Sequence, residues 1–174
     1  MGEPIKTQKG FYTGTFQNFD GSNYSVAGLE EKIKADGKSI TLFTGVGTNF
    51  GNNADMVVDF KGSMNYDAKG MLNQNIRLRT KVNDDKQTFQ VRYSPLSFNI
   101  PVGENTSLYA NPHYCGQISN DGEWKHSAGI FAGATQKLGK NTNVSVEVQR
   151  YNLQNINDNS GINWGINAIV SYQF

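Results

Sequence analysis

The sequence has little of several features that mark common protein classes. Cys115 is the only cysteine among 174 residues, so no intrachain disulfide can form. No run of about 18 apolar residues exists, which excludes a membrane-spanning helix. The formal net charge of +1 gives no electrostatic reason to expect nucleic-acid binding. No cysteine and histidine spacing suits a zinc site, so we expect neither a metal nor a cofactor.

A low average hydropathy does not exclude a membrane protein. Hydrophobic residues make up 37% of the chain and the mean hydropathy is −0.55, which taken alone suits a soluble protein. However, a strand of a membrane barrel shows lipid only every second side chain, so its average hydropathy stays low. Helical periodicity is nearly absent from the chain, whereas a two-residue alternation is widespread.

The alternation is clearest at the C-terminus, where apolar residues hold the even positions from Ile162 to Phe174 and Ile169 is the exception. Similar patterns predict strands around 40–50, 56–66, 72–82, 89–94, 108–115, 128–135 and 144–149, and two less regular strands near 10–19 and 23–34. Nine turn signals rich in glycine, asparagine and aspartate separate the strands. Nine turns give ten strands in a simple meander, or eight if the irregular N-terminal pair is something else.

The fold class predicted is all-β, a closed antiparallel up-and-down transmembrane β-barrel that forms one domain over residues 1–174, with an N-terminal tail at 1–9. The alternative is a soluble, lipocalin-like barrel with its apolar face inside. Small residues on the polar face fit a narrow lumen, and aromatic residues near strand ends fit a membrane interface. We therefore expect the apolar face to contact lipid, and the barrel must close because an open edge in lipid leaves backbone groups unpaired.

The last strand resembles the C-terminal signal of bacterial outer-membrane β-barrel proteins, in which alternating apolar residues end in an aromatic residue, usually phenylalanine. The residues that carry this resemblance are Gly165, Ala168, Val170, Tyr172 and Phe174. Residues 107–174 are also similar in strand order to the second half of small barrels of the OmpX and adhesin group, or to small porins. The resemblance implies a monomeric integral protein of the outer membrane, surrounded by lipid or lipopolysaccharide and inserted by the barrel-assembly machinery.

An outward apolar face places the polar positions in a lumen. The residues expected to line it are Asp59, Lys61, Arg77, Arg79, Lys81, Arg92, Asn111, His113, Glu147 and Gln149. Five of them are basic and fall on three consecutive strands, which predicts a basic stripe on one wall. Two interpretations remain open: the two acids pair with arginines in a filled lumen, or the excess of bases surrounds water in a narrow pore.

The function expected is a narrow, weakly anion-preferring channel for ions or small solutes. A structural or surface-interaction barrel with a filled polar lumen is the alternative, and an outer-membrane lipid or peptide hydrolase is a further one. His126 and Ser127 are adjacent and must point to opposite faces of a strand, so they cannot share a hydrolytic site. We therefore expect no enzyme.

Three further residues give local expectations. Pro95 and Pro112 lie inside apparent strands, and because proline cannot donate to a β ladder, a bulge or strand end is expected near each. Cys115 is expected to point into the lumen, where a thiol is inert.

Removal of Phe174 should impair assembly into outer membranes, because the resemblance makes the terminal aromatic residue part of the signal that is read during insertion. The measurement is the fraction of folded, heat-modifiable protein in isolated outer membranes. Phe89→Ala, which removes an aromatic residue from another predicted strand, is the control and should assemble normally. Normal insertion without Phe174 would count against the signal.

Overall fold

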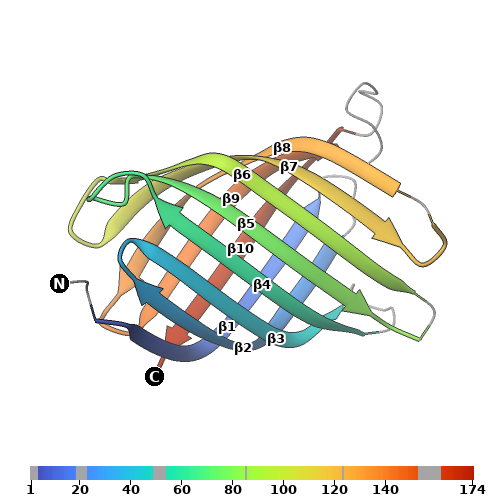
Figure 1. Cartoon of the computed structure of the whole chain (residues 1–174), viewed down its shortest axis with the longest axis horizontal. Helices are drawn as coiled ribbons and strands as arrows, with labels where there is room; N and C mark the ends of the chain where they lie inside the picture. The colour runs from blue at the N-terminus through green and yellow to red at the C-terminus, as the bar shows by residue number, and fades with distance from the viewer. Residues whose placement is uncertain (1–3, 19–22, 49–53, 85, 123, 153–161) are drawn as a thin grey trace.

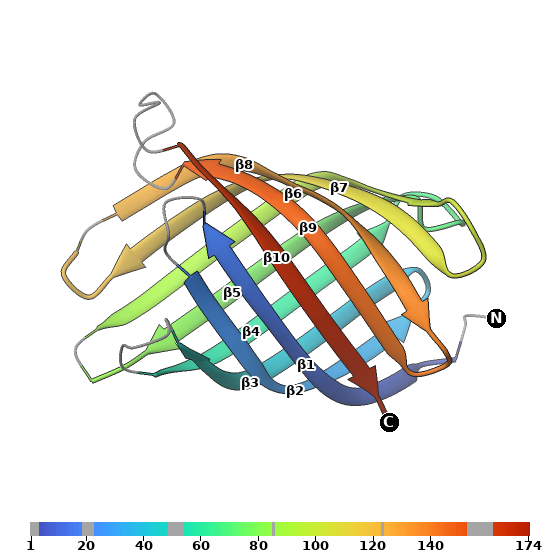
Figure 2. The same cartoon turned by 180° about the vertical axis from the view of Figure 1, so that it is seen from behind.

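A computed structural model describes residues 4–18, 23–48, 54–84, 86–122, 124–152 and 162–174. It shows a closed barrel in which each strand pairs antiparallel with its sequence neighbours and the first pairs with the last (Figures 1 and 2). The strands are β1 Lys6–Asn18, β2 Asn23–Ala35, β3 Lys38–Thr48, β4 Asp55–Asn65, β5 Leu72–Val82, β6 Gln87–Pro101, β7 Thr106–Ser119, β8 Trp124–Leu138, β9 Thr142–Asn152 and β10 Ile162–Gln173. The prediction of ten strands is confirmed, and the alternative of eight strands is wrong.

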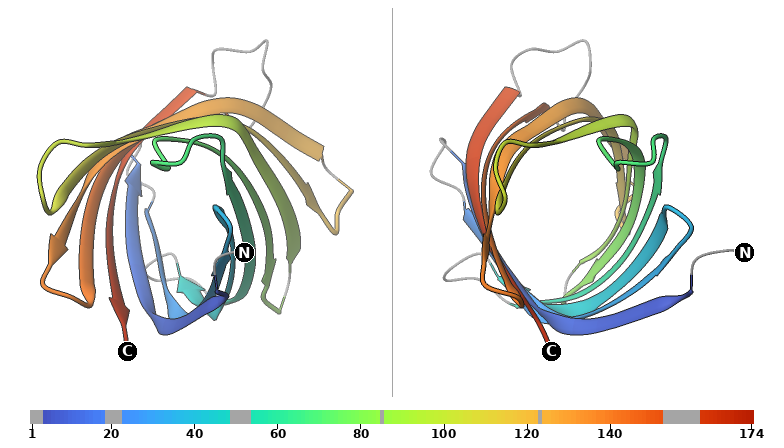
Figure 3. Two further views of the ribbon diagram at one scale, coloured as in Figure 1. Left: turned by 60° about the vertical axis from the view of Figure 1, so that its left-hand side comes forward. Right: turned by 90° about the vertical axis from the view of Figure 1, so that its left-hand side faces the viewer.

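The strands form a ring around one axis, as the end-on views in Figure 3 show. The start of β1 and the end of β10 lie at the same end of the barrel (Figure 1), where the backbone N–H of Phe174 donates to the carbonyl of Lys9 at 3.0 Å. No helix in the described part of the chain is long and apolar enough to cross a membrane.

The first strand begins earlier than its sequence pattern indicates. The predicted tail at 1–9 is wrong in its boundary, because β1 starts at Lys6 and its residues from Lys6 to Lys9 pair with Lys34 to Glu31 of β2. Side chains at this end are largely exposed whichever way they point. Polar residues therefore occupy both faces and hide the alternation.

Apolar side chains cover the outside of the barrel. In β3, Leu42 is exposed whereas Thr41 and Phe43 on either side of it are buried. Each of the ten strands carries at least one large exposed apolar residue, and strands such as β3, β4 and β10 carry several at alternate positions. A soluble protein does not expose apolar surface on this scale, so the barrel is inverted, with an apolar exterior for lipid and a polar interior. The soluble alternative is excluded.

A bulge in β6 changes which residues of that strand face inward. Between Ser94 and Ser97, β6 has one residue more than β5 opposite it, and its pairing with β7 is interrupted at the same place. Both serines are buried, although they are three positions apart. Inward residues therefore have even numbers before the bulge and odd numbers after it, and Phe98 faces outward as Tyr93 does.

Two prolines lie at this irregularity, as the sequence predicted. Pro95 belongs to the bulge itself, and Pro112 lies in the part of β7 that is opposite the interrupted stretch. Proline has no N–H to give to a neighbouring strand, so it is tolerated where the ladder is already broken.

The described turns follow the predicted signals. Turns at 35–38, 67–70, 102–105, 119–122 and 138–141 are confirmed. The signals that fall partly or wholly outside the described residues are those at 20–22, 51–54, 83–86 and 157–161. In the β4–β5 turn, the Asp67 carboxylate accepts hydrogen bonds from the backbone N–H groups of Leu72, Lys69 and Met71. These hydrogen bonds stabilise the ionised carboxylate and so lower the pKa of Asp67 below its usual value. The bond from the N–H of Leu72 has the largest effect.

Ala168→Arg should lower the free energy of unfolding by about 2–4 kcal/mol, the cost of arginine on the lipid face near the bilayer midplane. Ala168 is exposed on β10 halfway between the outward aromatic residues Trp164 and Tyr172. Thr7→Arg, at an exposed position at the start of β1, is the control and should cost no more than about 1 kcal/mol. Urea unfolding from lipid vesicles measures both, and equal costs would show that the membrane does not lie at this level.

Candidate functional site in the barrel lumen

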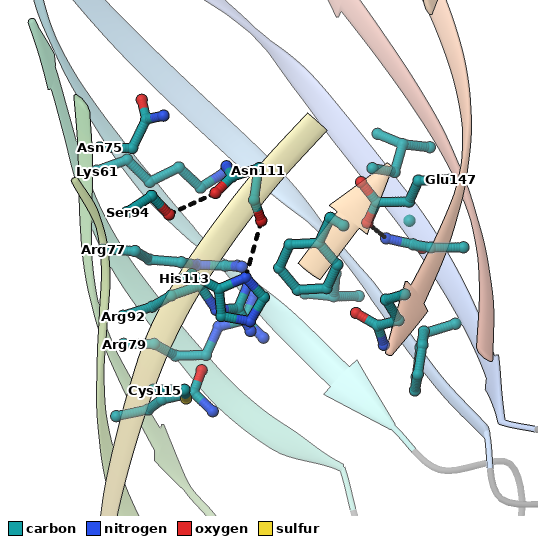
Figure 4. Close-up of a pocket in the computed structure, with 18 of the residues that line it drawn as sticks. Lys61, Asn75, Arg77, Arg79, Arg92, Ser94, Asn111, His113, Cys115 and Glu147 are labelled. Atoms are coloured by element: carbon teal, nitrogen blue, oxygen red, sulfur yellow. Dashed lines mark hydrogen bonds between the residues drawn. The ribbon is translucent and has the colours of Figure 1, made fainter. Parts of the chain in front are cut away.

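The lumen contains a cavity of about 570 Å³ that is lined by side chains from all ten strands (Figure 4). It reaches from Asn23 and Lys81, near the end of the barrel remote from the termini, to Lys32 and Ser39 near the other end. The stretch of β2 from Asn23 to Lys32, at roughly 3.3 Å per residue and a tilt of about 40°, covers roughly 20 Å along the axis. The cavity is therefore long and narrow.

Nine of the ten predicted lumen residues line this cavity. They are Lys61, Arg77, Arg79, Lys81, Arg92, Asn111, His113, Glu147 and Gln149. The tenth, Asp59, is 1% exposed and lies beside the arginines of the next strand. The predicted basic stripe lies on β4, β5 and β6. Figure 4 labels four of its residues, Lys61, Arg77, Arg79 and Arg92.

Asp59 is the ionic centre of the basic wall. Its carboxylate accepts two hydrogen bonds from Arg79, from Nε at 2.8 Å and from Nη2 at 2.9 Å, and a third from Arg77. A paired bond of this kind between a guanidinium and a carboxylate is among the strong interactions of proteins. The pairing expected for Asp59 is confirmed, and one carboxylate holds two arginines.

The pairing expected for Glu147 is wrong, because this acid bonds to neutral donors. Its carboxylate accepts hydrogen bonds from the Tyr109 hydroxyl at 2.8 Å and from Asn167 Nδ2 at 2.9 Å. Gly133 stands in register between Tyr109 and Glu147, and a Cβ there would lie 2.8 Å from the Cβ of Glu147. Because Gly133 has no side chain, Tyr109 of β7 can reach across β8 to Glu147 of β9. Glu147 also lies on the wall opposite the arginines (Figure 4).

Three of the basic side chains lie on aromatic rings from other strands. The contacts, from Nζ or the guanidinium carbon to the ring centre, are Lys61 on Tyr12 at 4.8 Å, Lys81 on Tyr24 at 3.9 Å, and Arg92 on Phe131 at 4.5 Å. Such contacts stabilise a cation by about 0.5–2 kcal/mol without neutralising it. Sequence reasoning missed them because the facing of the first two strands was undetermined and Phe131 interrupts a run of small residues.

The residues next to Arg92 complete this part of the lumen. His113 stacks on Phe131 with ring centres 4.4 Å apart, and its Nδ1 lies 3.1 Å from the carbonyl of Asn111. Cys115 faces inward and is buried, as predicted. Ser127 is also buried and lines the cavity.

His126 does not share a site with Ser127. Its ring lies against that of Tyr114, which is exposed on the outside of the barrel, at 6.2 Å between ring centres. The opposite orientation expected for His126 and Ser127 is confirmed, so these two residues do not form a common site.

The charges that line the cavity are mostly positive. The basic residues are Lys32, Lys61, Arg77, Arg79, Lys81 and Arg92, and the one acid among the described lining residues is Glu147. Lys32 was not predicted, because its strand showed no clear facing. Asp59 is buried beside the arginines, and the acids Glu30 and Asp55 also occupy inward positions, on β2 and β4. A narrow space with such walls concentrates anions.

Comparison with known proteins finds a shared fold. No family model and no curated protein matches the chain. Among solved structures, the β domain of the Bordetella autotransporter BrkA is similar with a TM-score of 0.54 and 12% identity, over 99% of this chain and 100% of that one. The apolar exterior and the closed sheet agree with this likeness. The fold is that of an integral outer-membrane β-barrel.

Two other solved structures are more distant. The NanC porin matches with a TM-score of 0.48 and 10% identity, over 97% of this chain and 99% of that one. OmpT, an outer membrane protein of Vibrio cholerae, matches with a TM-score of 0.42 and 12% identity over 87% of this chain, and the chain spans 56% of the OmpT length. These likenesses add nothing about activity.

Asp59→Asn should lower the free energy of unfolding by about 3 kcal/mol, since it removes the negative charge that pairs with two largely buried arginines while keeping the side-chain shape. Asp121→Asn is the matched control, because Asp121 pairs with Lys86 at 3.3 Å and both side chains are about half exposed. Its cost should stay below about 1 kcal/mol. Urea titration in vesicles measures both variants, and equal costs would mean that water in the lumen already screens the arginines.

Proposed function

We propose that the protein forms a narrow channel across the outer membrane that passes small anions in weak preference to cations. The observation that carries the proposal is the cavity lined by all ten strands, in which six basic side chains and one acidic side chain face the space. A rigid sheet surrounds this space on every side, so any solute that crosses the barrel meets the basic wall. No covalent step and no catalytic residue is part of the proposal.

The luminal bases are held so that they attract an anion without trapping it. Arg77 and Arg79 are partly neutralised by Asp59, and Lys61 and Lys81 rest on tyrosine rings. A channel must bind its ion well enough to admit it and weakly enough to release it. Several cations, each stabilised either by Asp59 or by an aromatic ring, provide a series of moderate sites along the axis.

A second candidate is a structural or surface-interaction barrel with a filled lumen. One observation favours it: Val26, Phe43 and Val57 form a buried apolar cluster inside the barrel, with Tyr12 and Tyr24 packed against it. This cluster and the cations on the tyrosine rings take up space on one side of the lumen. Under this alternative the cavity holds trapped water and conducts nothing.

We also propose that the last strand is the assembly signal read by the barrel-assembly machinery, as in small OmpX-like and adhesin-like barrels or small porins, and that the protein is a monomer in lipid. Val170, Tyr172 and Phe174 are exposed on the outside and so accessible to a partner. Gly165 has a structural role besides, since a Cβ there would lie 2.6 Å from the Phe16 ring.

Conductance in planar bilayers tests the channel. Refolded wild-type protein should give steady current steps, and its reversal potential in a salt gradient should show anion preference. Lys61→Gln combined with Lys81→Gln removes two luminal charges and leaves the Asp59 network intact, so the preference should shrink. Lys9→Gln, outside the lumen, is the control. Silence from folded, heat-modifiable protein would favour the filled barrel.

A further inference from the structure

Three basic side chains stand in one row across neighbouring strands. Lys61 is directly opposite Arg77 in the β4–β5 pairing, and Arg77 is directly opposite Arg92 in the β5–β6 pairing. Opposed residues on antiparallel strands have Cβ atoms about 4.5–5.5 Å apart, and like charges there repel each other. All three side chains line the cavity. The row therefore needs negative charge close by.

The protein supplies too little of that charge. Within the described residues, Asp59 is the acid that forms ion pairs with the luminal bases, and it is shared between Arg77 and Arg79. Lys61 and Arg92 have no ion pair in the described residues and lie on aromatic rings instead. A ring stabilises a cation but leaves its charge uncompensated. The four bases Lys61, Arg77, Arg79 and Arg92 thus have one ion-paired acid among the described residues, while Glu30 and Glu147 act on Lys61 and Arg92 without forming an ion pair.

Unpartnered polar atoms lie along the same row. The Nε atoms of Arg77 and Arg92 are buried without a hydrogen-bond partner among the described residues, and so is Oγ of Ser127, which is 0% exposed and lines the cavity. The row reaches Ser127 through Cys115, which is opposite Arg92 on one side and opposite Ser127 on the other. Buried polar groups nearly always have partners, so these donors point to a ligand that accepts hydrogen bonds.

We infer that the row Lys61–Arg77–Arg92 binds a small oxyanion that carries two or more negative charges, such as hydrogen phosphate or a dicarboxylate. Guanidinium groups bind such oxygens through paired N–H···O bonds, and lysine adds a compact charge. Three cations in register on neighbouring strands favour a multivalent anion over a monovalent one. The inference names the solute class of the proposed channel and rests on that channel for access to the site.

The test uses the full chain refolded in detergent, with inorganic phosphate as the probe and binding followed by titration calorimetry at constant ionic strength. Wild-type protein should bind phosphate saturably at one site. Lys61→Gln and Arg92→Gln should each weaken binding by roughly 10- to 100-fold, the loss expected when a charged donor is removed from an anion. Lys81→Gln is the matched control, because Lys81 lines the same cavity and also lies on a tyrosine ring but stands outside the row.

Equal weakening by Lys61→Gln and Lys81→Gln would overturn the site, since it would show general attraction by the lumen. Absence of phosphate and succinate binding to wild-type protein, or competition by acetate as strong as by succinate, would overturn it too. Stronger binding of succinate than of phosphate would support the site and assign its ligand to the carboxylates. Heat-modifiability confirms that each variant is folded.

Conductance separates the two proposals. Anion-selective current without binding of either probe would overturn the site and leave the channel standing. Binding by folded protein that gives no current would support the site and contradict the channel.

Discussion

Closure of the sheet between β1 and β10 is the constraint on which the rest of the structure depends. Hydrocarbon offers no hydrogen-bond partner to a free strand edge, so every backbone group must be satisfied within the barrel. The seam pairs Gly10 through Asn18 with Gln173 through Gly165. At Gly10 the strands approach so closely that a Cβ would lie 2.2 Å from the carbonyl oxygen of Tyr172. Once the ring is closed, alternate side chains must face either lipid or a narrow lumen.

Large side chains then fill the lumen opposite glycines, which have no side chain. A Cβ at Gly47 would overlap the Tyr24 hydroxyl, and a Cβ at Gly133 would meet the backbone and Cβ of Glu147. Gly47 therefore leaves room for the Tyr24 ring, and Gly133 leaves room for Tyr109 to reach Glu147. The first of these gaps lets an aromatic ring reach a basic residue, since Lys81 lies on Tyr24.

The sequence could predict facing because facing is a local property. In lipid the outer positions must be apolar, so a two-residue period in strands such as β4 and β10 fixes which side chains enter the lumen, and nine predicted residues line the cavity. Partners are not local. Glu147 bonds to Tyr109 two strands away through the gap at Gly133, and no single-strand pattern shows that register. The bulge in β6 is a similar case, because proline marks the place but not the number of extra residues.

The separation of charges inside the barrel argues that the bases serve something other than the stability of the fold. A lumen that was only a packing core would place each acid next to a base, since uncompensated charges away from bulk water are costly. Asp59 is used in this way, for two arginines at once. Glu147 is instead held on the other wall by a tyrosine and an asparagine. The fold thus holds Glu147 away from the basic wall, although a base beside it would lower the cost of its burial.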